Sequence, residues 1–298
     1  MSYHSVAEMA KRWGVSARTV RNYCAQGRIP GAILVGKTWS IPEDSQRPGR
    51  SSRKTGRTPT LLDTLKEQRV SGFPGGIYHK VQIELTYNSN HIEGSRLTHD
   101  QTRLIFETNT IGVSGRAVRV DDVVETANHF RCIDLVIDQA ARKPSEALIK
   151  QLHFMLKNGT SDSRKTWFAV GEYKRMPNEI GGRATAEPEE VSARMRELIG
   201  DYNAIERPTF DDLLDFHVRF ERIHPFQDGN GRVGRLLLFK ECLRWNIVPF
   251  LISEELKAFY YRGLSEWERE RGYLRDTCLT AQDGFKAWLD FFRIAYTD

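Results

Sequence analysis

The chain has 298 residues, of which 40% are hydrophobic and 28% charged, a balance typical of folded globular proteins. Its apolar runs fall short of the roughly 20 residues that a membrane-spanning helix needs, and its N-terminus lacks the apolar stretch of a signal peptide. We therefore expect a cytoplasmic protein without a membrane partner. Its four scattered cysteines form no Cys-x-x-Cys pair, which argues against a zinc finger or a thioredoxin-like redox site.

Charge is distributed unevenly along the chain. Residues 1–60 contain 11 Lys and Arg against 3 Asp and Glu, a net charge of +8, whereas the remaining residues have a net charge of −3. A basic segment attached to a slightly acidic body suggests that the two parts have different partners. The basic part is the candidate for contact with nucleic acid.

Residues 1–42 predict a compact winged helix-turn-helix domain. Ser5 is a suitable N-cap for a first helix over residues 6–13. A second helix follows a Gly-Val turn and ends at Gly27, because glycine is favoured just beyond a helix C-terminus. Residues 33–41 predict a β-hairpin, which would form the wing.

This pattern resembles the small winged helix-turn-helix of excisionase and MerR-type regulators. The resemblance implies duplex DNA as a partner of residues 1–42, and a two-fold DNA site would favour a homodimer. The candidate DNA contacts are Arg18, Thr19, Arg21 and Asn22 at the start of the second helix and Lys37 at the wing tip. The alternatives are contact with another protein and a purely structural module.

Residues 43–60 are rich in Pro, Gly, Ser, Thr and Arg, which predicts a flexible basic linker. Residues 61–298 form the main domain, and we expect a mainly α fold because its apolar periodicity is helical almost throughout. Residues 168–186 contain several glycines and predict a small β-hairpin or flap. The predicted helices cover residues 78–93, 98–107, 119–141, 145–157, 187–204, 209–222, 232–245, 253–270 and 281–296.

The centre of the main domain carries the strongest chemical pattern. A helix capped by Thr209 is expected to end at His224, because the following proline disfavours a helical conformation there. Gly229 and Gly231 lie in a loop that feeds an apolar helix, an arrangement that exposes backbone N–H groups to an anion. Two arginines three residues apart, Arg232 and Arg235, can hold phosphates beside that loop. A phosphate-binding site is therefore predicted here.

Asp228 and His224 add a metal ligand and a base to this predicted cradle. A carboxylate beside phosphates suits Mg²⁺, which takes few protein ligands. Histidine can remove a proton from an incoming hydroxyl near neutral pH. The loop contains no serine or cysteine, so transfer in one displacement is more natural than a covalent enzyme intermediate.

The segment from His224 to Arg235 resembles the Fic family motif, His-x-Phe-x-Asp/Glu-Gly-Asn-Gly-Arg-x-x-Arg, at every fixed position. The resemblance covers roughly residues 61–298 and implies a Fic-fold enzyme that transfers AMP from ATP to a Ser, Thr or Tyr hydroxyl of a target protein or of itself. It implies that His224 is the base and that Asp228 holds Mg²⁺ or Mn²⁺. The residues that it assigns to the nucleotide are Phe226, Gly229, Asn230, Gly231, Arg232 and Arg235.

Two further segments resemble parts of the same family. Ile180, Gly181 and Gly182 resemble its flap, which would align the peptide chain of the target beside the site. Residues 89–94, which include Ser89, Glu93 and Gly94, fit the family's inhibitory motif at the end of the helix predicted over residues 78–93. A bidentate pair between Glu93 and Arg235 would occupy the guanidinium intended for the γ-phosphate. Glu93 could also orient water for the reverse reaction, removal of AMP.

The nucleotide donor is less well determined by the sequence. Tyr260 and Tyr261 resemble a tyrosine pair that contacts adenine in some relatives, and aromatic core packing is the alternative. Those relatives have asparagine where this chain has Glu268. UMP or phosphocholine therefore stay open as transferred groups. A DNA-binding transcriptional regulator with a nucleotide-sensing Fic domain is the alternative to a dedicated enzyme.

Overall fold

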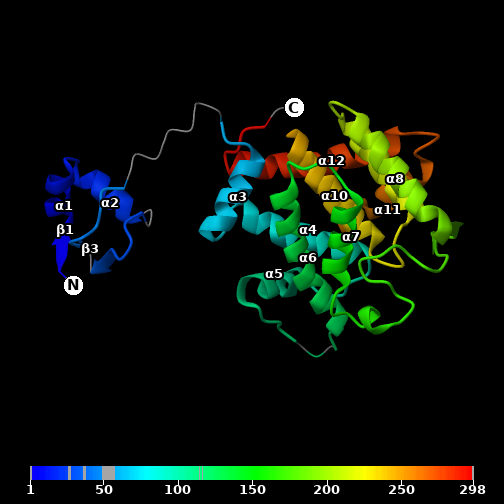
Figure 1. The fold of residues 1–298 in the computed structure, drawn as a ribbon, viewed down its shortest axis with the longest axis horizontal. Coiled ribbons are helices and arrows are strands. Elements are labelled where there is room, and N and C mark those ends of the chain that lie inside the picture. Colours follow the sequence, from blue (N-terminus) through cyan, green and yellow to red (C-terminus); the bar gives the residue numbers. More distant parts are fainter. Residues whose placement is uncertain are drawn as a thin grey trace. The chain divides into compact units, whose positions relative to one another are not determined.

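The computed structural model describes residues 2–25, 28–35, 38–48, 58–113, 115 and 117–296. The chain divides into two compact units, Met1–Thr58 and Pro59–Asp298. Figure 1 shows the small unit with its helices and strands and the larger, helical unit.

In its described residues the N-terminal unit has two helices and a three-stranded antiparallel sheet in the order β1-β3-β2. Its elements are β1 (Tyr3–Ser5), α1 (Val6–Trp13), α2 (Ala17–Ala25), β2 (Ile33–Val35) and β3 (Thr38–Pro42). The sheet is in register with Tyr3 opposite Pro42 and Leu34 opposite Trp39. The helix-turn-helix and its wing are confirmed, and β1 is a strand that the sequence did not predict.

Helices α1 and α2 and strand β3 each contribute to a common core, which includes Met9, Val20 and Ile41. Ser5 caps α1 as predicted, through a capping box in which Glu8 accepts from the Ser5 backbone N–H at 2.7 Å. Gly27 and Lys37, which were predicted to end the second helix and to form the wing tip, lie outside the described residues.

The regular structure of the main unit, over the residues that the structure describes, is helical apart from one short hairpin. Its helices are α3 (Leu61–Ser71), α4 (Ile77–Ile92), α5 (His99–Thr108), α6 (Val120–Gln139), α7 (Glu146–Lys157), α8 (Pro188–Ala204), α9 (Phe210–Ile223), α10 (Asn230–Trp245), α11 (Lys257–Glu266) and α12 (Gly272–Phe291). Single 3-10 turns cover Asp162–Arg164 and Glu254–Leu256. The mainly α prediction is confirmed. None of the helices in the described ranges has the length and apolar character needed to span a bilayer.

The helix predicted over residues 253–270 is shorter, since α11 covers Lys257–Glu266, and two other helices of this unit differ more. Helix α3 was not predicted, because its polar side chains obscure the apolar periodicity and its buried residues are Leu61 and Leu65. The last helix begins at Gly272 instead of residue 281, since Leu274 and Cys278 are sparse apolar positions that nevertheless lie in the core. Both helices are therefore defined by tertiary packing more than by local pattern.

Helix α10 forms the centre of the main unit. Every residue from Asn230 to Leu243 is buried. Helices α4, α6, α7 and α9 pack against it, and Figure 1 shows α4, α6 and α7 beside it. The N-terminus of α10 is therefore held rigidly at the point where the predicted phosphate loop enters it.

The predicted flap contains a short β-hairpin, in which β4 (Glu179–Ile180) pairs with β5 (Arg183–Ala184). Gly181 and Gly182 connect the two strands with φ values of 54° and 74°. Positive φ at both central positions is typical of a type I′ hairpin turn, whose twist matches that of the strands, and glycine adopts such values without strain.

Candidate active site

Helix α9 places His224 at the edge of the site. Thr209 and Asp212 form the predicted capping box at its start, and His224 ends it with φ 49° and ψ 62°. The His224 Nδ1 atom lies 3.2 Å from the Glu221 carbonyl oxygen. A carbonyl oxygen only accepts, so Nδ1 carries the proton and Nε2 has the free lone pair.

The protonation state of His224 follows from its surroundings. Burial lowers the pKa of this imidazole; the Glu221 carbonyl opposes the effect, and the nearby Lys174 ammonium adds to it. The ring is therefore neutral near pH 7, which is the state that a proton acceptor needs.

The loop after His224 is closed by Asn230 and stacked on α7. The Asn230 side chain accepts from the Phe226 N–H at 2.8 Å and donates to the Phe226 carbonyl at 2.8 Å. Phe226 is fully buried, and its ring lies parallel to that of His153 with centroids 3.9 Å apart. The side chains of Phe226 and Asn230 thus shape the loop, and the nucleotide contacts predicted for these residues would have to come from their backbone.

The turn into α10 depends on two glycines. Gly229 is the N-cap of α10 with φ 82°, a conformation that favours glycine. A Cβ atom on Gly231 would lie 2.3 Å from Glu93 Oε1. The absence of a side chain at residue 231 therefore lets Glu93 approach the first turn of α10.

Arg235 is held by the end of α4. Its Nη2 donates to Glu93 Oε1 at 2.7 Å and to the Ser89 carbonyl at 2.9 Å, and its Nε donates to Ser89 Oγ at 3.0 Å. The structure therefore brings Ser89, Glu93 and Arg235 together. The predicted bidentate ion pair is replaced by a single contact with Glu93, while Ser89 accepts from Nε and from Nη2.

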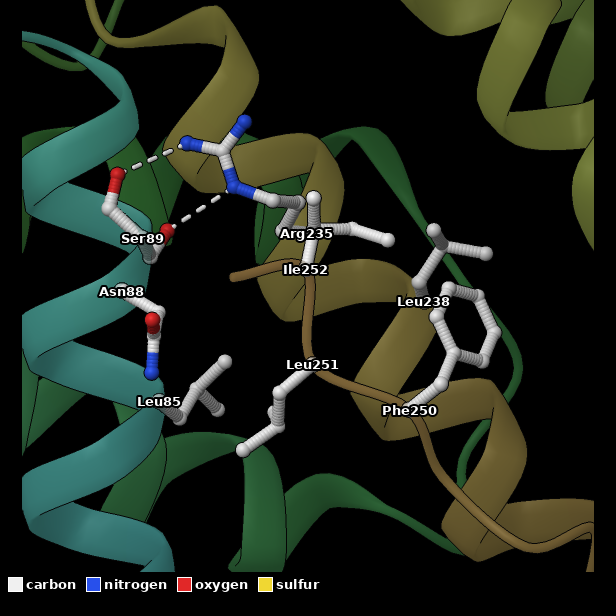
Figure 2. A pocket seen from close by; sticks show the side chains of 8 residues that line it. All are labelled: Leu85, Asn88, Ser89, Arg235, Leu238, Phe250, Leu251 and Ile252. Atoms are coloured by element: carbon white, nitrogen blue, oxygen red, sulfur yellow. Dashed lines mark hydrogen bonds between the residues drawn. The ribbon is translucent and has the colours of Figure 1, made fainter. Parts of the chain in front are cut away.

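The surroundings of Arg235 are close-packed. Figure 2 shows its guanidinium pointing from α10 to Ser89 on α4, beside a small cavity of about 10 Å³, which holds roughly one water molecule. Burial would lower the pKa of Arg235, but Glu93 raises it above its ordinary value. Apolar side chains line the cavity beside Arg235 and Ser89: Leu85, Leu238, Phe250, Leu251 and Ile252.

The end of α4 is shaped to place Glu93. Glu93 is the residue that ends this helix, and Gly94 follows with φ 89°. The Glu93 and Gly94 N–H groups donate to the Asn90 and His91 carbonyls at 3.1 and 3.0 Å. Glycine at residue 94 is needed for this turn, which ends α4 directly after Glu93.

Asp228 and Arg232 form a second ion pair at the entrance to α10. Arg232 Nη2 lies 3.3 Å from Asp228 Oδ2, and its Nη1 donates to Glu125 of α6. Burial would raise the pKa of Asp228, but Arg232 and Lys157 hold it well below its ordinary value. The Asp228 side chain is 49% exposed. An ionised, half-exposed carboxylate is a suitable ligand for Mg²⁺ or Mn²⁺.

Lys157 and Glu125 are parts of the site that the sequence did not reveal. The Lys157 ammonium is 2% exposed and lies 2.7 Å from Asp228 Oδ2 and 2.5 Å from Glu125 Oε1. In the sequence Lys157 resembles an ordinary cation at a helix C-terminus, and Glu125 resembles a surface carboxylate. The only local signal was that Lys157 lies one turn after His153 and next to the apolar Leu156.

His153 connects the loop with the flap. Its Nδ1 accepts from the Gly171 N–H at 2.9 Å, so Nε2 carries the proton and donates to the Asp228 carbonyl at 3.1 Å. Burial lowers the pKa of His153 to about 3, which keeps the ring neutral in this bridging role.

The flap lies against the residues that follow α9. The Lys174 N–H donates to the Pro225 carbonyl at 2.8 Å, and Asn178 Nδ2 donates to the Phe226 carbonyl at 3.0 Å. These bonds place Ile180, Gly181 and Gly182 on a hairpin beside the predicted base. Gly181 and Gly182 are exposed, and Ile180 is partly buried.

The two tyrosines predicted to contact adenine have different environments. Tyr260 is 1% exposed, and its hydroxyl lies 2.5 Å from His217 Nε2. Its ring is therefore part of the core, which was the alternative interpretation. Tyr261 is 38% exposed and lies next to it, with ring centroids 5.6 Å apart.

The predicted DNA contacts of the N-terminal unit lie on one exposed side of α2. Arg18, Arg21 and Asn22 are exposed and Thr19 is partly exposed, whereas Val20 is buried against α1. Thr19 also contacts Ser16, whose hydroxyl accepts from the Thr19 N–H at 3.2 Å. Two guanidiniums and an amide at a helix start form a surface that suits phosphates.

Comparison with known proteins agrees with both parts of the chain. Residues 143–241 match the Fic/DOC family, and residues 5–45 match a helix-turn-helix domain. A protein adenylyltransferase Fic of Drosophila willistoni is 28% identical over 233 residues, and one of Drosophila grimshawi is 27% identical over 234 residues. These matches cover 70% of this chain and 44% and 46% of the relatives, so the chain spans less than half the length of the relatives that it matches.

Solved structures show the same fold. A Fic domain containing signaling protein from Bacteroides thetaiotaomicron is 27% identical, with a TM-score of 0.57 over 77% of this chain and 90% of that protein. Fic-1 from C. elegans has a TM-score of 0.59 at 18% identity, over 78% of this chain and 72% of that protein, which is a likeness of fold alone. The chain therefore contains a domain of the Fic/DOC family, preceded by a helix-turn-helix domain.

Proposed function

We propose that this chain is a self-inhibited protein adenylyltransferase that transfers AMP from ATP to a Ser, Thr or Tyr hydroxyl of a target protein. The observation that carries the proposal is the constellation around α10, in which His224, a glycine loop and Arg235 converge at one helix N-terminus. The adenylyltransferase names of the Drosophila relatives support it.

The reaction follows from the residues present. His224 Nε2 takes the proton of the target hydroxyl, and the freed oxygen forms a bond to the α-phosphorus of ATP as the bond to pyrophosphate breaks. The N–H groups at the start of α10 face the developing charge, together with Arg232 and Arg235. Asp228 would hold Mg²⁺ or Mn²⁺, which supplies positive charge beside the phosphates when bound.

Glu93 would keep this chemistry switched off. It contributes a negative charge to the guanidinium that is intended for the γ-phosphate, at 2.7 Å from Arg235 Nη2. ATP would have to displace Glu93, or bind in a pose that avoids Arg235. In that state the α-phosphate is not aligned with the hydroxyl that His224 deprotonates.

The replacement Glu93→Gly tests both parts of the proposal. We expect self-labelling by ATP labelled in the α-phosphate to rise at least about tenfold, because the freed guanidinium can hold the γ-phosphate. Adding His224→Ala should abolish this labelling, since the base is lost. Absence of labelling in folded Glu93→Gly protein with Mg²⁺ or Mn²⁺ would refute AMP transfer.

Two further experiments identify the nucleotide donor and the direction of transfer. Mass spectrometry of Glu93→Gly protein after incubation with ATP, UTP and CDP-choline identifies the transferred group and the modified residue. An added AMP supports the proposal, whereas UMP or phosphocholine would redirect it to another donor. Loss of AMP from a labelled protein in the presence of wild-type enzyme but not Glu93→Gly would show that Glu93 orients water for the reverse reaction.

The exposed arginines of α2 favour a second function, binding of duplex DNA by the N-terminal unit. Arg18 and Arg21 would contact phosphates, so affinity should fall steeply with salt concentration. Replacing either by alanine should reduce the slope of log affinity against log salt by about 1. If removal of residues 1–60 leaves DNA affinity unchanged, this unit is not the DNA-binding part.

A further inference from the structure

The Lys157 side chain occupies the middle of a carboxylate cluster behind the glycine loop. Its Nζ lies 2.5 Å from Glu125 Oε1, 2.7 Å from Asp228 Oδ2 and 2.8 Å from Asp162 Oδ2. These three oxygens lie within 4.8 Å of one another, close enough to bind one divalent cation. The ammonium thus stands where a small metal ion would otherwise meet all three carboxylates.

The charges of the cluster nearly cancel. Glu125, Asp162 and Asp228 face two buried cations, Lys157 and Arg232. The exposed Lys165 adds a third cation at 2.6 Å from Asp162. A free divalent cation would therefore meet little net attraction and would be repelled by two fixed positive groups.

Lys157 also fixes the carboxylate that the proposed function uses. Asp228 Oδ2 accepts from Lys157, and the Asp228 carbonyl accepts from His153, which lies one turn earlier on the same helix. Both ends of Asp228 are thus held by one face of α7. Replacing either contact by water would leave the half-exposed carboxylate free to change rotamer.

We propose that Lys157 is a positioning residue that acts as a built-in cation: it holds Asp228 in place and keeps the loop from binding a divalent metal ion before nucleotide arrives. The phosphates of the nucleotide then supply the missing negative charge, so that metal and nucleotide enter together. This inference rests on the proposed function, because it takes Asp228 as the residue that meets the metal ion.

The test is a titration of the full-length protein with Mn²⁺ in the absence of nucleotide. Electron paramagnetic resonance measures the concentration of free Mn²⁺ at each step. Wild-type protein should show no site tighter than about 1 mM, and Lys157→Met should bind Mn²⁺ at least about tenfold more tightly. Lys150→Met is the matched control, because it removes an ammonium from the same helix that pairs with Glu172 outside the cluster. It should bind Mn²⁺ as the wild type does.

A purely structural role for Lys157 would give a different result. Folded Lys157→Met protein with wild-type Mn²⁺ affinity would overturn the proposal, and so would a wild-type site tighter than about 1 mM without nucleotide. The wild-type measurement can therefore overturn the proposal even if the variant does not fold. Adding Asp162→Asn to Lys157→Met should reverse the gain. Because no nucleotide is present, these outcomes are independent of whether the protein transfers AMP.

Discussion

At the scale of single residues, many side chains of the site make hydrogen bonds to other groups of the protein and do not face solvent. Asn230 closes its own loop, His153 bridges two backbone segments, and Ser89 takes two of the donors of Arg235. A motif in the sequence identifies such residues but does not say which of them touch a ligand. The structure separates the groups that line the loop from those that support it.

We expect that Ser89 and Glu93 both restrain the Arg235 side chain. Ser89→Ala removes the Oγ contact at 3.0 Å but keeps the carbonyl contact and Glu93. We expect self-labelling to rise only about two- to fivefold, since the neutral Ser89 hydroxyl restrains the guanidinium less than the Glu93 carboxylate does. Labelling assays beside Glu93→Gly check this, and a rise as large as that of Glu93→Gly would show that Glu93 is not the main restraint.

His153 should make stability depend on pH. Burial lowers its pKa to about 3 in the folded chain, whereas an unfolded histidine titrates near about 6.5. Its contribution to stability is therefore complete above pH 6.5 and is lost as pH falls toward 3, because the unfolded state takes up the proton first. The free energy of unfolding should fall by up to about 1.4 kcal/mol per pH unit from this group.

Urea unfolding at pH 7 and pH 5 measures that slope. His153→Gln should be less stable at pH 7 but lose less stability on acidification than the wild type. The same replacement at the half-exposed His99 controls for the loss of a histidine. Equal slopes in wild-type and His153→Gln protein would mean that the buried ring does protonate in the folded state.

At the scale of helices and strands, local pattern predicted what was strongly amphipathic or well capped. The box of Thr209 and Asp212 marked the start of α9, and the two glycines at 181 and 182 marked the flap turn. Helix α3 was missed because its neighbours in the fold supply its stability. Lys157 and Glu125 meet across 32 residues of sequence, and that pairing depends on how α6 packs on α7.

The contact between α11 and α12 should be sensitive to one methyl group. A Cβ on Gly263 would lie 2.6 Å from the Leu274 Cα atom, so the helices would have to separate. We expect Gly263→Ala to cost about 1–3 kcal/mol in the free energy of unfolding, because overpacking displaces backbone.

Gly284→Ala is the matched control for this prediction. It lies within α12 and a Cβ there would meet nothing within 4 Å. It should stabilise the protein by roughly 0.5–1 kcal/mol, since alanine favours a helix more than glycine does. Chemical denaturation of both variants compares them, and a neutral or stabilising Gly263→Ala would show that the two helices can move apart without loss.

At the scale of the whole molecule, the chain has two units with separate cores. The core of the N-terminal unit consists of residues between Val6 and Ile41, and that of the main unit lies between Leu61 and Ile294. We expect residues 59–298 alone to keep the thermal midpoint of the main unit within about 3 °C of the full chain, a change of less than about 1 kcal/mol. Calorimetry of the shortened chain measures it.

The shortened chain also separates the two proposed functions. With Glu93→Gly it should still label itself with AMP, because the residues from Ser89 to Arg235 all belong to the main unit. It should no longer bind duplex DNA. Loss of labelling together with a retained thermal midpoint would mean that the N-terminal unit contributes directly to transfer.

The buried position of α4 sets the ratio of the enzyme to its inhibitory helix. Nine of its residues are buried in the described structure, and they contact the same core that positions α10. Each chain that folds its main unit therefore also forms the contact between Glu93 and Arg235. On the proposed function, enzyme and inhibitor are made in a fixed ratio of one to one. Raising expression would then raise the stock of restrained enzyme without raising activity in proportion.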